Sequence, residues 1–206
     1  MSMQKQNPEK QSVKKDESIL VVKRDYLFGV QAWHGMRKPN DDSFIKTVLL
    51  KKEFLPRSLM EYDFSYKQII PYLVFRFEDT YFFMQRKSKA SESRLRSKYS
   101  FGIGGHIRQE DITDADIVSW ARREFYEEVD YKGDFQVEFL GILNDDSNDV
   151  GKVHVGFVYL LHGDSNDISV KDELQSGRLL TLDNCSHYYE QMESWSQMVF
   201  DFLQSR

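Results

Sequence analysis

Apolar residues recur along much of the chain with the spacing of β-strands, and turn-forming residues separate the runs. Two of these runs, 68–77 and 80–86, have only Glu78 and Asp79 between them, which is typical of a hairpin with a tight turn. We therefore predict two adjacent antiparallel strands at this point. The same signal predicts four further strands, at 18–28, 44–50, 135–143 and 152–161.

Helical spacing replaces the strand pattern in two places. Apolar residues that share one face predict a helix over 114–129. Thr113 and Asp116 have the spacing of a capping box, which places the start of this helix near residue 114. A second stretch, 184–204, carries large apolar residues at nearly helical spacing and predicts a helix used for core packing or a subunit contact.

Three glutamates stand close together on the first of these helices. Glu124, Glu127 and Glu128 occupy positions i, i+3 and i+4, which places their carboxylates on one face. Like charges at this spacing destabilise a helix by roughly 0.2 to 0.5 kcal/mol per pair, and by more where the surroundings are apolar. A positive charge is therefore expected beside this face.

Two sources of positive charge fit the sequence. Arg123 can reach Glu127 one turn later, but one guanidinium cannot neutralise three carboxylates. A hard divalent cation with oxygen ligands can, and Mg²⁺ is usually held by a few carboxylates together with substrate phosphates. Gly104 and Gly105 precede the helix, and a turn without side chains would let a backbone carbonyl add a ligand.

The segment from Gly105 to Tyr131 resembles the Nudix box, G-x5-E-x7-R-E-U-x-E-E-x-G-U, where U is apolar. The core of the box matches in full over 123–128, with the sequence REFYEE. Asp111 stands where the family has Glu, and eleven residues rather than seven separate it from Arg123. This spacing predicts an extended loop ahead of the helix and leaves Glu110 and Asp111 as rival occupants of the first acidic position. Asp130 replaces the final glycine of the box.

The resemblance implies a fold and a reaction. The implied fold is an α/β/α sandwich with a mixed β-sheet, covering roughly 67–182. The implied reaction is hydrolysis of a pyrophosphate bond in a nucleoside diphosphate linked to another group X. Glu127 and Glu128 would bind Mg²⁺ or Mn²⁺ with help from Glu124 and a backbone carbonyl at Gly104 or Gly105. Glu124 would be the general base or a third ligand, and Arg123 would orient the carboxylates.

A local excess of positive charge follows the predicted hairpin. Six cations stand against the single acid Glu92 in a chain that is acidic as a whole: Arg86, Lys87, Lys89, Arg94, Arg96 and Lys98. A solvated loop explains this pattern as well as a binding site does. In the functional interpretation, one or two of the cations neutralise substrate phosphates beside the metal, and Arg86, Arg96 and Lys98 are the candidates.

An Asn/Asp-rich loop at 144–151 resembles the opening of a calcium-binding loop, counted from Asp145. The twelfth position is Gly156 rather than Glu, and no pair of predicted helices flanks the loop, so an EF-hand is excluded. A hairpin connection is the simpler interpretation, with a supporting role at the substrate cleft as the alternative. His154 follows on the next predicted strand, where a core or interface histidine is expected rather than a metal ligand.

The chain divides into three parts by pattern. Residues 1–17 are almost entirely polar and are predicted to form a disordered tail. Residues 18–66 precede the region of resemblance and form an N-terminal extension or small subdomain, which could pack on the substrate cleft or make a homodimer contact. Residues 67–206 are the predicted Nudix hydrolase domain with its C-terminal helix.

Composition narrows the classes of function. The 206 residues, 40% of them hydrophobic, suffice for the core of one domain. A net charge of −5 argues against a nucleic-acid polymer as partner. Cys185 is the only cysteine, which excludes a disulfide framework and a cysteine-based zinc cluster. No apolar run approaches the roughly 20 residues of a membrane span, so we expect a soluble, cytoplasmic protein.

Two rival functions share the scaffold that the resemblance implies. A Nudix-fold isomerase of prenyl diphosphates needs a proton-donating pair, typically a cysteine with an acid, and Cys185 lies far beyond the box. A non-catalytic nucleotide-binding sensor normally lacks one of the box carboxylates, and here Glu124, Glu127 and Glu128 are all present. The sequence therefore favours the hydrolase over both.

Overall fold

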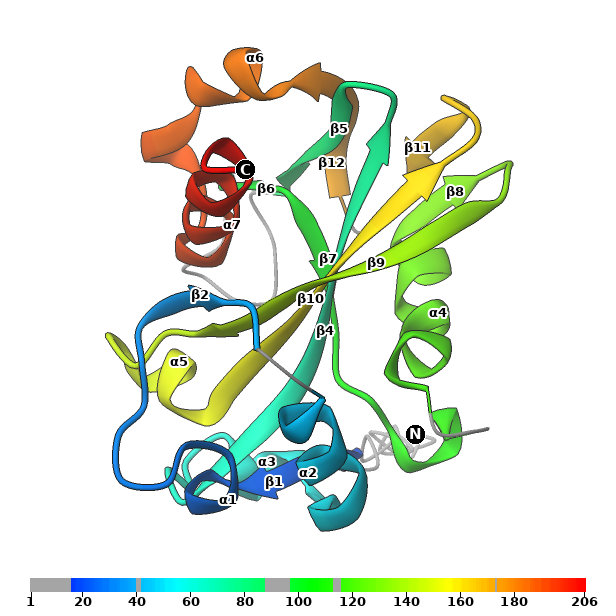
Figure 1. Cartoon of the computed structure of the whole chain (residues 1–206). Coiled ribbons are helices and arrows are strands. Elements are labelled where there is room, and N and C mark those ends of the chain that lie inside the picture. Colours follow the sequence, from blue (N-terminus) through cyan, green and yellow to red (C-terminus); the bar gives the residue numbers. More distant parts are fainter. Residues whose placement is uncertain (1–15, 40–41, 88–96, 113–115, 173) are drawn as a thin grey trace, which may run out of the picture.

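The computed structural model describes residues 16–39, 42–87, 97–112, 116–172 and 174–206. Within these residues, ten strands form one mixed sheet that has helices on both faces (Figure 1). The predicted α/β/α sandwich with a mixed β-sheet is thereby confirmed. The predicted disordered tail lies outside the described residues, except for Asp16 and Glu17, which both contact α3 (Arg57–Met60).

The main path of the sheet runs β12-β5-β4-β10-β9-β2. The bounds of these strands, in that order, are Leu174–Thr181, Thr80–Arg86, Tyr66–Phe77, His154–Gly163, Phe135–Asn144 and Gly35–Arg37. The pairing of β4 with β10 is parallel, whereas the other pairings are antiparallel. The parallel register sets His154 opposite Gln68, so the starts of β4 and β10 lie side by side.

Short strands extend the sheet along β4 and β5. The strand β1 (Ser18–Lys23) pairs with β3 (Glu53–Pro56) and with the beginning of β4, while β7 (Gly102–Gly104) pairs with the middle of β4. The strand β6 (Tyr99–Ser100) pairs with β5. A separate two-stranded sheet joins β8 (Val129–Tyr131) to β11 (Ile168–Val170). The loop that leaves β7 therefore starts beside the central strand.

The helices divide between the two faces of the sheet. The longest, α4 (Ile117–Glu128), packs on one face together with α1 (Arg24–Phe28) and α2 (Ser43–Lys51). The other face is covered by α6 (Leu182–Ser186) and α7 (Ser194–Gln204). Figure 1 shows α4 and α7 on opposite sides of β4 and β10. The remaining short helical elements are α5 (Asp149–Val153) and the 3-10 turns η2 (Gln109–Asp111) and η3 (Tyr189–Gln191).

The N-terminal extension shares the main core. Leu20 and Val22 of β1 and Val48 of α2 are buried in the same cluster as Trp120 and Phe125 of α4. Because β1 also pairs with β4, the extension continues the sheet and places α3 near the start of the central strand. No helix within the described ranges combines the length and the apolar character needed to cross a membrane.

Two strand predictions in the extension are wrong. Residues 44–50 lie in the helix α2, because Phe44, Ile45, Val48 and Leu49 turn one helical face to the core while Leu50 is exposed. A short apolar run of this kind is compatible with either a helix or a strand, and its packing against neighbouring elements determines which one forms. The strand predicted over 18–28 ends at Lys23, after which the chain turns into α1.

The predicted ends of two helices are also wrong. The helix predicted from residue 114 begins at Ile117, with Asp116 as its N-cap: the carboxylate accepts a hydrogen bond from the Val118 N–H at 3.0 Å. Thr113, the other half of the predicted capping box, lies outside the described residues. The helix predicted over 184–204 is divided, and only its second half is the regular helix α7.

Candidate active site

The face of α4 that carries the three glutamates borders a cavity of about 410 Å³. The helix is anchored by Ile117, Trp120, Ala121 and Phe125, which are buried in the main core. This anchoring sets the rotation of the helix, so all three box glutamates reach the wall of the cavity. The cavity has the size that is usual for small-molecule sites.

Arg123 holds the acidic groups of this region together. Its guanidinium forms a paired interaction with Asp111, with Nε 2.7 Å from Oδ1 and Nη2 2.8 Å from Oδ2. Its Nη1 lies 2.8 Å from a carboxylate oxygen of Glu124 and 2.9 Å from one of Glu127. Asp111 rather than Glu110 therefore occupies the position opposite the arginine, at the end of the extended loop. These contacts raise the pKa of Arg123, with the Asp111 hydrogen bonds contributing most.

Glu124 lies directly against the glycine pair. A Cβ added to Gly105 would come within 2.3 Å of Cδ of Glu124, so only glycine permits this approach. Burial raises the pKa of the Glu124 carboxyl, and the neighbouring Arg123 only partly offsets this effect. Glu124 shares the positive charge of Arg123 with Asp111 and Glu127, which contact the same guanidinium.

Three arginines outside the box also line the cavity. Arg57 of α3, Arg86 of β5 and Arg108 of the loop after β7 all reach the wall. Each also contacts an acid: Arg57 and Arg108 reach Glu17, at 3.3 and 2.7 Å, and Arg86 lies 3.6 Å from Glu193. The lining of the cavity thus contains both carboxylates and guanidinium groups.

Sequence reasoning identified only part of this positive wall. Arg86, a predicted phosphate-binding residue, lines the cavity. Lys98 does not line the cavity; its Nζ contacts the backbone carbonyl of Glu190 on the exposed surface, at 3.5 Å. Arg96 lies outside the described residues, as do Lys89 and Arg94. Sequence reasoning missed Arg57 and Arg108. The polar loop after the glycine pair was a signal for Arg108, whereas nothing local distinguishes Arg57.

Further polar and aromatic groups complete the wall. His106 and His154 face the cavity, and the loop 144–151 contributes Asp145 and Asn148. Burial lowers the pKa of His106 well below its usual value, and the positive charge of Arg57 adds to the effect, so its imidazole is neutral at pH 7. Trp195 supplies a half-buried aromatic ring.

The only cysteine lies away from this site. Cys185 is fully buried in α6, within the core on the far face of the sheet, and it does not line the cavity. Burial raises the pKa of its thiol to about 12. The group is therefore unsuited to proton transfer to a ligand of the cavity, which removes the isomerase interpretation.

Comparisons with known proteins agree with this geometry. No protein-family model matches the chain. Protein YmaB of Bacillus subtilis (strain 168) is 31% identical to it over 204 residues, which cover 93% of this chain and 99% of that protein. The crystal structure of Tm1382, a proposed Nudix hydrolase, matches with a TM-score of 0.77 and 31% identity, over 92% of this chain and 99% of that one.

A more distant structure shares the fold. The NUDIX domain of Shewanella oneidensis NrtR, solved in complex with ADP ribose, matches with a TM-score of 0.54 and 13% identity. That match covers 68% of this chain and 88% of the domain. Because the strong matches extend over nearly the whole chain and the box residues line one cavity, the chain belongs to the Nudix hydrolase family.

Proposed function

We propose that the protein hydrolyses the pyrophosphate bond of a nucleoside diphosphate linked to another group, with Mg²⁺ or Mn²⁺ as cofactor. The observation that carries the proposal is that one cavity is lined both by the three box glutamates and by three arginines, Arg57, Arg86 and Arg108. Cleavage of a pyrophosphate requires both kinds of group. Positively charged side chains neutralise the phosphate oxygens, and carboxylates hold the metal ion.

The box fits a hard divalent cation. Its side-chain donors are the carboxylates of Glu124, Glu127 and Glu128, and the close approach of Gly105 leaves room for a backbone carbonyl as a further oxygen ligand. Arg123 offsets the burial of the Glu124 charge only in part, and a bound cation would offset the rest. When bound, the ion supplies charge neutralisation at the phosphate oxygens and lowers the pKa of the attacking water.

The protein groups have separate tasks in this proposal. Arg123 orients Glu124 and Glu127 and, through Asp111, ties the helix to the loop ahead of it. Arg57, Arg86 and Arg108 bind the phosphates of the substrate. Glu124 serves as general base or as third metal ligand. The N-terminal extension thus contributes to substrate binding through Arg57.

The apolar part of the wall suits the nucleoside. Ile70, Tyr72 and Trp195 are grouped there, and the ring centroids of Tyr72 and Trp195 lie 5.8 Å apart. The half-buried ring of Trp195 is the proposed stacking surface for a base. ADP ribose is the first compound to test, since it is bound to the NrtR domain. A bifunctional NMN adenylyltransferase/ADP ribose pyrophosphatase from Francisella tularensis also shares the fold, with a TM-score of 0.50 and 15% identity over 41% of that chain.

A substrate screen tests the proposal. The full chain is incubated with Mg²⁺ or Mn²⁺ and with ADP-sugars including ADP ribose, dinucleoside polyphosphates, NADH, deoxynucleoside triphosphates and coenzyme A, and released phosphate or nucleotide is scored. We expect metal-dependent cleavage of at least one class and no turnover in EDTA. Binding of a nucleotide without cleavage of any compound would instead establish the sensor interpretation.

Gly105→Ala should reduce the activity of the protein while it leaves the stability almost unchanged. The added Cβ displaces the Glu124 carboxylate from its place against the loop. The displaced group is the end of a flexible side chain, so we expect the free energy of unfolding to change by less than about 0.5 kcal/mol. Because misplacement by about 1 Å can cost 100-fold in rate, kcat/KM should fall about 10- to 100-fold. Gln109→Ala, on the exposed loop, is the control; equal losses in both variants would refute the close-approach argument.

Glu124→Gln should stabilise the metal-free protein at pH 7 while it impairs turnover. The pKa of Glu124 is raised in the folded state, so the carboxyl favours folding below its usual pKa of 4.5, and this contribution is lost as the pH rises through the raised value. The amide lacks the buried charge, and we expect a gain of about 0.5–1 kcal/mol at pH 7 that disappears at pH 4.

Thermal unfolding in EDTA at both pH values measures this effect, with Glu110→Gln, an exposed acid of the same region, as the control. Millimolar Mg²⁺ should raise the Tm of the wild type more than that of Glu124→Gln, because the ion binds only the folded state. A variant that is less stable than the wild type at pH 7 would show that Glu124 is fully compensated by Arg123.

Cytoplasmic location and homodimer formation remain predictions from the sequence. Size-exclusion chromatography with light scattering tests the second of them directly.

A further inference from the structure

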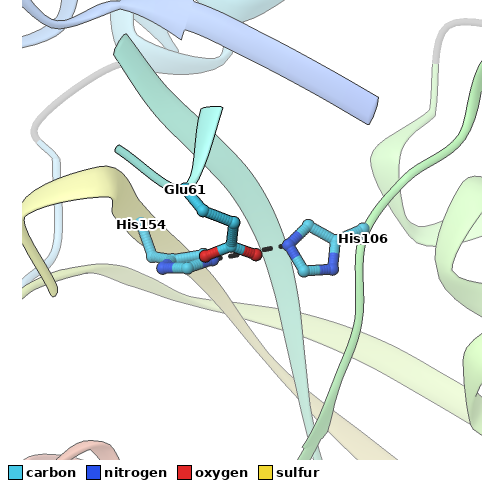
Figure 2. Close-up of side chains that lie close together, drawn as sticks. All are labelled: Glu61, His106 and His154. Carbon is cyan, nitrogen blue, oxygen red and sulfur yellow. Dashed lines mark hydrogen bonds between the residues drawn. The ribbon is translucent and has the colours of Figure 1, made fainter. Parts of the chain in front are cut away.

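Two histidines and a glutamate converge at the edge of the cavity, outside the Nudix box. Nε2 of His106 and Nε2 of His154 lie 3.4 Å apart, and these atoms and a carboxylate oxygen of Glu61 all lie within 4.8 Å of one another. Figure 2 shows the Glu61 carboxylate close to both imidazole rings, beside the contact that joins His106 and His154. The three residues come from three different segments of the chain.

The fold brings these segments to one point. His154 is the first residue of β10 and lies opposite Gln68, near the start of the parallel strand β4. His106 follows β7, which pairs with the same central strand. Glu61 is the C-cap residue of α3, and the amide of Gln68 ties that turn to β4 by donating to the Met60 carbonyl at 3.1 Å. The cluster is therefore set by the sheet rather than by a mobile loop.

Surrounding hydrogen bonds orient the three side chains as ligands. Nδ1 of His154 lies 2.7 Å from the Val150 carbonyl, so this nitrogen carries the proton and Nε2 keeps its lone pair. Arg57 Nε donates to Oε1 of Glu61 at 3.1 Å, which leaves the other carboxylate oxygen for a ligand bond. Histidine ligands of metal ions almost always have such a partner on the second ring nitrogen.

The spacing matches a tetrahedral metal site. With metal–nitrogen distances of about 2.0–2.1 Å, two ligands of a tetrahedral zinc ion lie about 3.3–3.4 Å apart. The two Nε2 atoms already have this separation. In the metal-free protein, His106 Nε2 shares its proton with Oε1 of Gln68, 2.6 Å away. In a metal complex this proton moves to Nδ1, so that Nε2 can bind the ion.

We propose that Glu61, His106 and His154 form a second metal site, for a transition-metal ion of the zinc class. Imidazole nitrogens select such ions, whereas the all-oxygen box selects Mg²⁺ or Mn²⁺, so the two sites differ in chemistry. His106 and His154 line the cavity, which gives the ion a path from solvent. The bound ion ties α3 of the N-terminal extension to the domain beside the arginine wall. This proposal does not depend on the proposed hydrolytic activity.

Cobalt(II) absorption spectroscopy on the metal-free full chain tests the proposal. Cobalt in a tetrahedral site with nitrogen ligands absorbs visible light strongly, whereas cobalt held by oxygen ligands in an octahedral box absorbs weakly. We expect one tetrahedral cobalt per chain, displaced by one equivalent of Zn²⁺. Crystals grown with Zn²⁺ should show an anomalous peak in contact with both Nε2 atoms, a readout that needs no variant.

Substitutions assign the ligands. His106→Gln and His154→Gln should each weaken cobalt binding by at least about 100-fold, and Glu61→Gln by about 10-fold. His162→Gln, on the exposed end of the same strand β10, and the box variant Glu127→Gln should leave the tetrahedral band unchanged. Circular dichroism of the metal-free variants verifies folding. A wild type without the tetrahedral band, a band that survives both histidine substitutions, or a band that Glu127→Gln abolishes would each overturn the proposal.

Discussion

Glu127→Gln and Glu128→Gln should each reduce metal-dependent turnover by about 1000-fold or more. Each substitution replaces a charged oxygen ligand at the wall of the cavity by a neutral amide, which binds Mg²⁺ poorly. Losing one preorganised charge-stabilising group typically costs 100- to 1000-fold, and a lost metal ligand removes that stabilisation together with the activation of water. The measurement is kcat/KM with the substrate found in the screen, at several Mg²⁺ concentrations.

These two variants should keep the fold. Glu127 is half exposed, and its contact with Arg123 is one of several that the guanidinium makes, so the loss of one charge should be tolerated. Glu110→Gln removes an exposed acid near the same helix and should retain full activity. Undiminished turnover in both box variants, with normal circular dichroism spectra, would refute the assigned site.

Lys67→Met should have the largest effect on stability, a loss of about 3–5 kcal/mol. The ammonium group is completely buried and donates to Oδ1 of Asp146 at 2.8 Å and to the carbonyls of Gly151 and His154 at 2.7 and 3.1 Å. Methionine fills a similar volume but leaves both carbonyls and part of the Asp146 charge without a partner. Burial lowers the pKa of Lys67 to about 8, yet the ammonium form persists at pH 7.

Urea denaturation at pH 7 measures the loss, with Lys152→Met as the matched control. Lys152 forms an exposed ion pair with Asp149 at 2.9 Å, and its replacement should change the free energy of unfolding by less than about 0.5 kcal/mol. Equal effects of the two substitutions would contradict the claim that the buried ammonium group of Lys67 stabilises the fold through its contacts with Asp146, Gly151 and His154.

Local pattern was sufficient to predict the central elements and the box. The hairpin of β4 and β5 was predicted correctly because strongly apolar strands flank a turn of two acidic residues. The spacing of the three glutamates predicted a common helical face, and the structure places them on one wall of the cavity. Both predictions depend on residues that are close in the sequence, where helix and strand periods decide which side chains meet.

The rest of the site depends on contacts that the local pattern does not encode. Arg57 reaches the cavity only because β1 joins the sheet and carries α3 to the start of β4. The pairing of His106 with His154 follows from the parallel register of β4 and β10, which no single segment specifies. Asp111 rather than Glu110 occupies the first acidic position of the box because the η2 turn places the Asp111 carboxylate against Arg123. These three features therefore depend on how distant segments of the chain come together in the fold, which local sequence patterns do not predict.

A crystal of the full chain grown with millimolar Mn²⁺ tests the central claim most directly, because the anomalous signal of manganese locates the ion without reference to turnover. We expect a peak within ligand distance, about 2.0–2.3 Å, of oxygens from Glu127 and Glu128, with Glu124 or the Gly105 carbonyl nearby. Carboxylates that point into bulk solvent, with no peak beside them, would contradict the assignment of this cavity as the catalytic site.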